Sequence, residues 1–350
     1  MLSYKDLVEE TAQALEANGI LSVDALERFK QSVGPTVSLH PSELFADPRT
    51  QCSKIGGIPN ALAPNMWPVG KMESELTFPM TFVAQLDLSQ MPSGLSDVIP
   101  LPSLGWLSFF VNEHALFGGK SGPPCAVIYS QELYEARQHL QVAQGAFQGF
   151  LFEVLLDVIG PDEKFLENSN GMTPKEHFLA ISANYATSSV FFSEAHKTWA
   201  AYPCVPVQPR MSFSFSSIHW GFDVGFGVAE PDAQSILKVR DQLLGIECLD
   251  EFAAVPSHKM GGIPDASNVT TGGKYGHYPS WLNKVPDAES AISYQDGAAD
   301  DPYILLLQLD TMEIKRDPIP AYSSMTTCKL MMWGNMADLK FFARRSDLLK

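Results

Sequence analysis

The sequence predicts an α+β protein whose β-rich body is a duplication. The main observation is a motif that occurs twice, as Lys54-Ile55-Gly56-Gly57-Ile58-Pro59-Asn60-Ala61 and as Lys259-Met260-Gly261-Gly262-Ile263-Pro264-Asp265-Ala266. Each copy is followed by a Trp and then by an apolar run that ends in Gln-Leu-Asp. A second observation is a change of character after Gly34-Pro35, where helical periodicity gives way to short apolar runs between Pro and Gly residues. We therefore expect two related halves behind an N-terminal helical hairpin.

The hairpin is expected within residues 1–34, packed on the body. Ser3 is placed to cap a helix from Tyr4 to about Asn18, and Gly19 ends it. Ser22 is placed to cap a second helix from Val23 to Gln31, in which Val23, Leu26 and Phe29 are expected to point inward.

Residues 35–350 are expected to form one composite domain made of two repeats, at about residues 50–160 and 255–350. Expected strands of the first repeat lie at 78–88, 105–111 and 125–129, followed by a helix from Gln131 to about Ala143 capped by Ser130. A strand, a turn and another strand are expected within 211–226, and a helix capped by Asp232 ends at Gly245. In the second repeat, strands are expected at 303–310 and around 329–342.

Composition sets limits on function. The 350 residues carry a net charge of −16, which opposes binding to nucleic acid or to an anionic membrane and favours solubility or a basic protein partner. The five cysteines are dispersed without a C-x-x-C pair, as is usual for reduced thiols in a cytoplasm. The longest apolar neighbourhood, 147–159, is shorter than the ~20 residues that span a bilayer. We expect a cytoplasmic protein, and the sequence does not indicate its oligomeric state.

Four segments resemble the YwqG-like family, a mostly bacterial family without an assigned function. They are the Gly56-Gly57-Ile58-Pro59 turn with Trp67-Pro68, the run 82–88, the run 105–110, and Trp333-Gly334 with Asp347-Leu348. The resemblance covers about residues 50–350 and implies a duplicated α+β fold with interlocked β-rich halves, without a cofactor or an established reaction. Some members lie near toxin genes, which suggests an immunity role. The chain departs from the family pattern at Leu282 and at Asn335, where Pro and Asp are expected.

The glycine pairs Gly56-Gly57 and Gly261-Gly262 have a backbone explanation, because glycine tolerates positive φ and close approach by another segment. A ligand-contacting loop is the alternative, although the spacing is not that of a phosphate-binding loop. Gln85 and Gln308 end apolar strands and are expected to tie neighbouring loops, or else to contact a ligand between the halves. Asp87 and Asp310 are expected to cap turns, with an acid–base pair as the alternative.

The histidines and aromatic residues supply the remaining candidates. The eight histidines show no metal-binding spacing, so neither a metal nor a cofactor is expected, although a site could assemble across the fold. Cys52 and His258 precede the two repeat motifs, and a buried thiol is preferred there over a nucleophilic pair. The aromatic candidates are expected to pack in the core or to line a sugar- or peptide-binding groove: Trp67, Trp106, Tyr275, Tyr278, Trp281 and Trp333.

The sequence therefore predicts a binding or interaction protein, with an immunity-like role as one form of it. A ligand or partner is expected in a cleft between the repeats. The candidate residues of this cleft are Gly56, Gly57, Trp67, Gln85, Asp87, His258, Gly261, Gly262, His277, Gln308, Asp310 and Trp333. The alternatives are a hydrolase that uses carboxylates and histidines from both repeats, and a carbohydrate-binding module. The sequence shows no recognisable catalytic motif.

Overall fold

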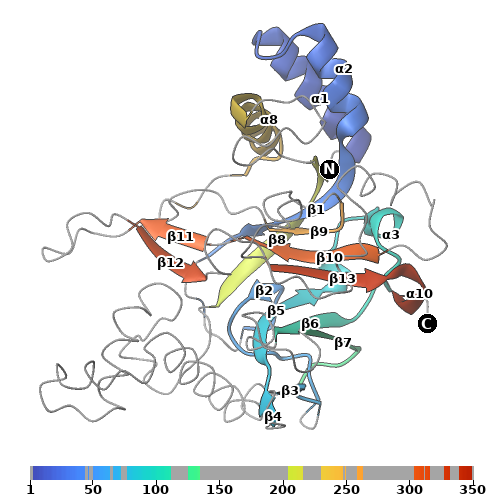
Figure 1. Ribbon diagram of the computed structural model, residues 1–350, viewed down its shortest axis with the longest axis vertical. Coiled ribbons are helices and arrows are strands. Elements are labelled where there is room, and N and C mark those ends of the chain that lie inside the picture. The colour runs from blue at the N-terminus through green and yellow to red at the C-terminus, as the bar shows by residue number, and fades with distance from the viewer. Residues whose placement is uncertain are drawn as a thin grey trace, which may run out of the picture.

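The computed structural model has a mixed helix and strand fold, and sheet is the larger component (Figure 1). It describes residues 3–43, 46, 50–63, 66–71, 77–111, 125–134, 204–215, 230–246, 249, 258–262, 303–310, 312–315, 327–331 and 339–348. Expectations for the middle of the chain, for the loop 267–301 and for Trp333 fall outside these residues.

Helices are present at both expected N-terminal positions: α1, Tyr4–Ala17, and α2, Val23–Ser32. Ser3 and Asp6 form a capping box at the start of α1, and the Ser22 hydroxyl accepts a hydrogen bond from the Ala25 N–H at the start of α2. Leu26 and Phe29 are buried as expected, but Val23 is 66% exposed, so the inward orientation expected for Val23 is wrong. Val23 is the first residue of α2, where the apolar face of the helix is open to solvent.

A single sheet of nine strands dominates the structure, in the order β13-β10-β9-β1-β8-β2-β5-β6-β7. Its first four strands along the chain are β1, Gly34–Pro41; β2, Lys54–Ile55; β5, Thr81–Asp87; and β6, Trp106–Val111. The later ones are β7, Cys125–Ser130; β8, Val205–Ser214; β9, Lys259–Met260; β10, Tyr303–Leu309; and β13, Leu339–Arg344.

Smaller elements complete the described part. Two separate hairpins pair β3, Val69–Lys71, with β4, Thr77–Pro79, and β11, Met312–Lys315, with β12, Thr327–Met331. The remaining helices are η1, Leu88–Gln90; α3, Leu95–Val98; α8, Glu230–Leu243; and α10, Arg345–Leu348. No helix in the described residues is long and apolar enough to cross a membrane.

The sheet curls so strongly that it is nearly closed. Phe109 on β6 and Phe341 on β13 lie near opposite ends of the strand order, yet their ring centroids are 5.1 Å apart. Both rings are buried in the same large core, together with Val37 of β1 and Leu307 of β10. The inner face of the sheet is therefore the main hydrophobic core.

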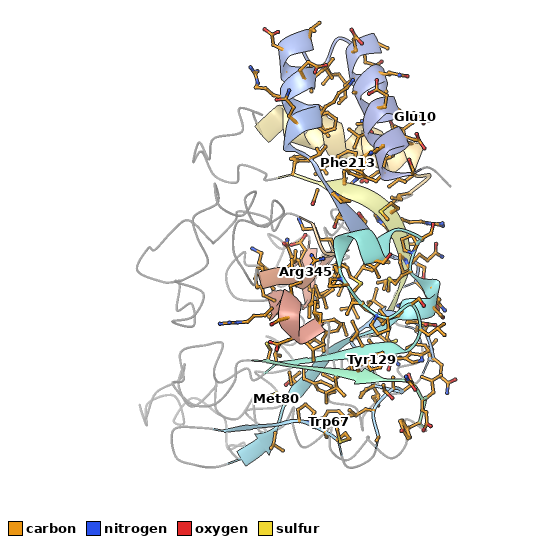
Figure 2. All side chains as sticks on the ribbon, turned by 90° about the vertical axis from the view of Figure 1, so that its right-hand side faces the viewer. Glu10, Trp67, Met80, Tyr129, Phe213 and Arg345 are labelled. Carbon is orange, nitrogen blue, oxygen red and sulfur yellow. The ribbon has the colours of Figure 1, made fainter. Side chains whose placement is uncertain are left out.

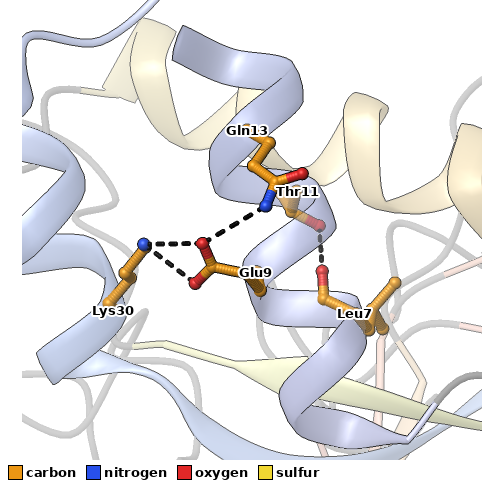
Figure 3. Close-up of polar contacts among 5 residues, drawn as sticks. All are labelled: Leu7, Glu9, Thr11, Gln13 and Lys30. Carbon is orange, nitrogen blue, oxygen red and sulfur yellow. Dashed lines mark hydrogen bonds and ion pairs between the residues drawn. The ribbon is translucent and has the colours of Figure 1, made fainter.

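A second core lies at one end of the molecule, where α1, α2 and α8 gather (Figure 1). Phe213 and Phe215 near the end of β8 reach into this layer, and the Phe29 and Phe213 ring centroids are 5.4 Å apart. Figure 2 shows Phe213 beneath the helices and Trp67 and Met80 at the opposite end. The ion pair between Glu9 and Lys30 joins α1 to α2, with a nitrogen–oxygen distance of 2.9 Å (Figure 3).

Strand pairing repeats around the centre of the sheet. We name β1, β2, β5 and β6 the N-terminal strand set, and β8, β9, β10 and β13 the C-terminal strand set. Lys54 of β2 pairs with Gln85 of β5, and Lys259 of β9 pairs with Gln308 of β10. The register of β5 on β6 shifts between Phe82 and Ala84, and that of β10 on β13 shifts between Leu305 and Leu307. In both sets, the shift begins three residues before the Gln of the Lys–Gln pair.

The two sets exchange strands at the centre. All of β1 pairs with the antiparallel strand β8, with His40 opposite Gln208. On its other side, β1 pairs with β9 of the C-terminal strand set, whereas β8 pairs with β2 of the N-terminal strand set. We call these contacts the β1–β9 junction and the β8–β2 junction.

Three further expectations need correction. Residues 131–134 are not helical, because the Ser130 hydroxyl closes a local turn on the Glu132 N–H instead of capping a helix. The helix expected to start after Asp232 begins at Glu230. The expected strand after Met211 begins at Val205, and β1 was not expected at all, because the prolines in both segments argue against central strands.

Candidate functional site

Both repeat motifs form tight turns with two consecutive glycines in the left-handed region. The φ angles are 69° and 74° at Gly56 and Gly57, and 64° and 74° at Gly261 and Gly262. Gly56 and Gly57 are buried, as are the residues that follow them up to Leu62. The first turn is thus enclosed by protein, which favours the backbone explanation of the motif.

Gly262 is fixed by its neighbours as well as by its φ angle. A Cβ atom at this position would lie 2.8 Å from the Thr36 Cβ and 3.0 Å from the Pro35 carbonyl oxygen, and it would also meet the Ser214 hydroxyl. Thr36 donates its hydroxyl hydrogen bond to the carbonyl oxygens of Met260 and Gly261. The second glycine turn therefore packs directly on β1 and β8.

Gln85 uses both ends of its amide inside the protein. Its Oε1 accepts hydrogen bonds from the Asn60 and Ala61 N–H groups at 2.7 and 3.0 Å, and its Nε2 donates to the Cys52 carbonyl oxygen at 3.3 Å. The side chain is completely buried. These bonds tie the segments on both sides of β2 to β5, as expected for a fold-fixing glutamine.

Lys54 is a completely buried lysine in the same cluster. Its Nζ donates to the Thr50 carbonyl oxygen at 2.7 Å and to the Asn60 Oδ1 at 2.6 Å. Lys259 and Gln308, which occupy the matching pair in the C-terminal strand set, are 5% and 0% exposed. A Lys–Gln pair is thus buried in each set.

Asp87 and Asp310 lie at the ends of β5 and β10. The Asp87 carboxylate accepts hydrogen bonds from the Ser89 N–H at 2.9 Å and from the Ser89 hydroxyl at 2.6 Å, so Asp87 caps η1. The Asp87 N–H donates to the Ser53 hydroxyl at 2.9 Å, and the Asp310 N–H donates to the His258 Nδ1 at 3.0 Å. The residue that corresponds to His258 is therefore Ser53, not Cys52 as the sequence suggested.

Two histidines are buried near the centre of the sheet. His40 on β1 is 8% exposed, and neither of its ring nitrogens has a hydrogen-bond partner within the described residues. His258 is 2% exposed, and its Nε2 likewise lacks a partner there. Burial lowers the pKa of each imidazole from 6.5 to about 3. Arg240 and Arg210 lower the pKa of His40 further, and His40 lowers that of His258.

Trp67 packs in a small aromatic cluster. It is half-buried, its indole N–H donates to the Met80 carbonyl oxygen at 2.9 Å, and its ring lies edge-on to Phe110 at 5.4 Å. Both the apolar body and the polar end of the indole are thus engaged with protein. The other candidates His277, Trp281 and Trp333, with Tyr275 and Tyr278, lie outside the described residues.

Cys52, Cys125 and Cys204 are present as thiols. Cys52 and Cys125 are half-buried, and Cys204 is buried. Burial raises the pKa of Cys52 and raises that of Cys125 to about 11, which opposes formation of a nucleophilic thiolate. No three His, Cys, Asp or Glu residues of the described ranges are grouped to hold a metal ion.

Three buried polar residues near the repeat motifs were not among the candidates from the sequence: His40, Ser53 and Lys54. Lys54 belongs to the repeated motif, so its recurrence as Lys259 was a usable signal. Ser53 could have been found by applying the offset of the motif to His258. His40 carried no such signal, since it lies among prolines in a segment not expected to be a strand.

Comparison with known proteins assigns the chain to a family. The profile of the family described as Domain of unknown function (DUF1963) matches residues 53–350. The chain belongs to this family. No curated protein matches the chain significantly. The match begins after β1, although β1 pairs with strands on both sides in the middle of the sheet. The described fold of this DUF1963 protein thus includes a central strand upstream of the matched residues.

Proposed function

We propose that this DUF1963 protein is a non-catalytic binding protein that recognises a basic protein partner in the cytoplasm. The observation that carries the proposal is the charge of the helical layer, considered with the net charge of −16 of the whole chain. An acidic surface attracts basic partners and speeds their association. An immunity-like role would be one form of such binding.

Acidic residues outnumber basic residues in helices α1 and α2. Three basic residues, Lys5, Arg28 and Lys30, stand against six exposed acidic residues: Asp6, Glu9, Glu10, Glu16, Asp24 and Glu27. Lys30 is already engaged by Glu9 (Figure 3). The other acidic residues of these helices are exposed. Glu10 lies on this layer, at the end of the molecule away from Trp67 (Figure 2).

Buried polar groups support binding rather than hydrolysis. Asp87 caps a turn, and His258 accepts a backbone hydrogen bond. Lys54 and Gln85 hold the loop that contains the first glycine turn. A hydrolytic dyad needs a carboxylate or imidazole within reach of substrate. Gln85, Asp87 and His258 are instead hydrogen-bonded to the backbone of the protein itself.

We infer further that the scaffold is a duplication with interlocked halves, in line with the YwqG-like resemblance. Three correspondences between the strand sets support this inference: the buried Lys–Gln pairs, the matching shifts of register and the double-glycine turns. The exchange of β1 and β8 between the sets, with β1 paired to β9 and β8 paired to β2, supports the interlocking. Binding at the outer helical layer would leave this buried scaffold intact.

Charge removal in the helical layer tests the binding proposal. A variant with Glu10→Gln, Glu16→Gln and Glu27→Gln removes exposed carboxylates without touching the core. The control carries Glu43→Gln and Glu132→Gln, two exposed carboxylates outside the helices. The wild type and the two variants are used as bait in extracts from the native cell, and each protein retained is purified and its affinity for all three is measured directly.

The expected partner is a basic protein that binds the wild type and the control equally and the helix variant at least about tenfold more weakly, with a loss of affinity at high salt. Equal binding to all three baits would refute a role for the helical layer. Repeated recovery of no basic protein by the wild type would refute the proposed function.

A further inference from the structure

The two buried histidines lie where β1 meets β9. Ser38 of β1 pairs with Lys259 of β9, and the Leu39 N–H donates to the His258 carbonyl oxygen at 2.9 Å. His40 is the next residue of β1. The imidazoles are close enough for charge on His40 to lower the pKa of His258. Both therefore belong to the β1–β9 junction.

The hydrogen bond to His258 fixes its tautomer. Because Nδ1 accepts the Asp310 N–H, the proton of the neutral ring is on Nε2. This arrangement makes Nε2 a donor and not a lone-pair ligand, so a metal ion is a poor occupant. Protonation of His258 would convert Nδ1 into a donor facing a donor, and the Asp310 hydrogen bond would be lost.

The surroundings of His40 also oppose a positive charge. Arg210 of β8 and Arg240 of α8 are the charged groups that act on it, and both disfavour its protonated form. The Arg240 guanidinium is engaged by Asp241 at 2.7 Å. Lys259 follows His258 in the chain, and the Asp310 backbone N–H donates to the His258 ring. Within the described residues, no carboxylate is hydrogen-bonded to either ring.

The β8–β2 junction has the same backbone contacts with side chains that do not titrate in this range. There Pro206 pairs with Lys54, and the Val207 N–H donates to the Ser53 carbonyl oxygen at 2.9 Å. The positions that match His258 and His40 are thus Ser53 and Gln208. The Ser53 hydroxyl accepts the Asp87 N–H as His258 accepts that of Asp310.

We propose that His40 and His258 form an acid-sensitive latch that holds β9, and with it β10 and β13, on the centre of the sheet. Opening of the β1–β9 junction admits water and restores the ordinary proton affinity of both rings. Acid then stabilises the open form. The β8–β2 junction lacks these groups and stays closed, so acid opens the molecule on one side.

Hydrogen exchange followed by mass spectrometry tests the latch, with rates corrected for the intrinsic effect of pH. In the wild type, β10 is expected to lose about tenfold or more in protection relative to β5 between pH 7 and pH 5, since each histidine binds a proton on opening. The matched variant is His40→Gln with His258→Ser, which copies the residues of the other junction. It should show equal pH dependence in β5 and β10.

Ser53→Ala provides the control for loss of a hydrogen bond without loss of a titrating group. It should weaken protection at the β8–β2 junction at both pH values and leave the pH dependence of β10 unchanged. Persistence of the acid response of β10 in the double variant would overturn the proposal. An equal acid response of β5 and β10 in the wild type would also overturn it.

A second measurement probes the two rings directly in the folded wild type and uses variants for assignment alone. NMR titration of the histidine rings in the wild type should show two that stay neutral from pH 8 to pH 5. Assignment by single His40→Gln and His258→Ser substitutions should identify them. Titration of either ring near 6.5 in the folded protein would overturn the latch.

Discussion

The β1–β9 and β8–β2 junctions have the same backbone pattern but different chemistry. In each, a Lys of the short inner strand pairs with the central strand, and the preceding carbonyl oxygen accepts the next N–H of that strand. One junction carries His40 and His258, and at the matching positions the other carries the exposed Gln208 and the buried Ser53. The hydrogen-bond geometry can thus be kept while one side carries a titrating group, because Ser53 accepts the Asp87 N–H and His258 accepts the corresponding Asp310 N–H.

Removal of β1 is expected to have the largest effect on both junctions. A chain lacking residues 1–41 still contains everything matched by the family profile, yet it lacks the strand between β9 and β8. We expect no cooperative unfolding transition in urea, because the freed strands expose their backbone groups and the main core opens.

A chain lacking only residues 1–32 is the control for this deletion. It loses α1 and α2, which cover part of Phe213, but it retains β1 and α8. It should keep the strand signal in circular dichroism with a lower urea midpoint. A wild-type midpoint for the 1–41 deletion would show that the two strand sets do not depend on β1.

Acid should destabilise the wild type through the two histidines. Their folded-state pKa is about 3 and the ordinary value is 6.5, so the unfolded chain binds more protons as the pH falls between these values. The stabilisation is fully present above pH 6.5 and is lost toward pH 3, at up to about 1.4 kcal/mol per pH unit for each histidine. Urea unfolding between pH 7 and pH 4.5 measures how much unfolding free energy is lost per pH unit. In the His40→Gln, His258→Ser double variant this loss should be smaller by up to about 1.4 kcal/mol per pH unit for each histidine removed.

Gln85→Ala tests whether the buried glutamines contribute equally to stability in both strand sets. It leaves the Asn60 and Ala61 N–H groups and the Cys52 carbonyl oxygen without their partner, which should cost about 2–4 kcal/mol of unfolding free energy. Gln308→Ala, at the matching position, should cost a similar amount. A loss below about 1 kcal/mol for Gln308→Ala alone would show that the second loop is held by other groups.

Sequence reasoning succeeded where one residue determines a local structure. The Ser3 and Ser22 caps, the glycine turns and the strand that ends at Asp87 all follow from short-range chemistry. It failed for β1 and for the start of β8, because proline usually excludes a central strand and only the pairing of distant segments overrides that preference. His40 was missed for the same reason. The expected cleft, and whether Gly56, Trp67 or Asp310 contacts a ligand, stay predictions.

Gly262→Ala should separate crowding from backbone conformation. Its φ of 74° costs about 1–2 kcal/mol for a residue with a side chain, and the contacts with Thr36 and Pro35 add to that cost. Gly19→Ala is the matched control, since Gly19 has a φ of 65° and nothing within 4 Å of the added Cβ. Urea unfolding should show a clearly larger loss for Gly262→Ala. Equal losses would mean that β1 and β8 can move away from the turn.

The smallest expected effect concerns the contact that closes the sheet. Phe109 and Phe341 occupy corresponding places, because each lies one residue beyond the partner of the buried glutamine: Ser108 for Gln85 and Lys340 for Gln308. Their edge-on rings should be coupled by about 1 kcal/mol beyond the burial of each. A double-mutant cycle with Phe109→Leu and Phe341→Leu measures this coupling and limits the cavities. Additive losses would show that the two strand sets meet there without a specific aromatic contact.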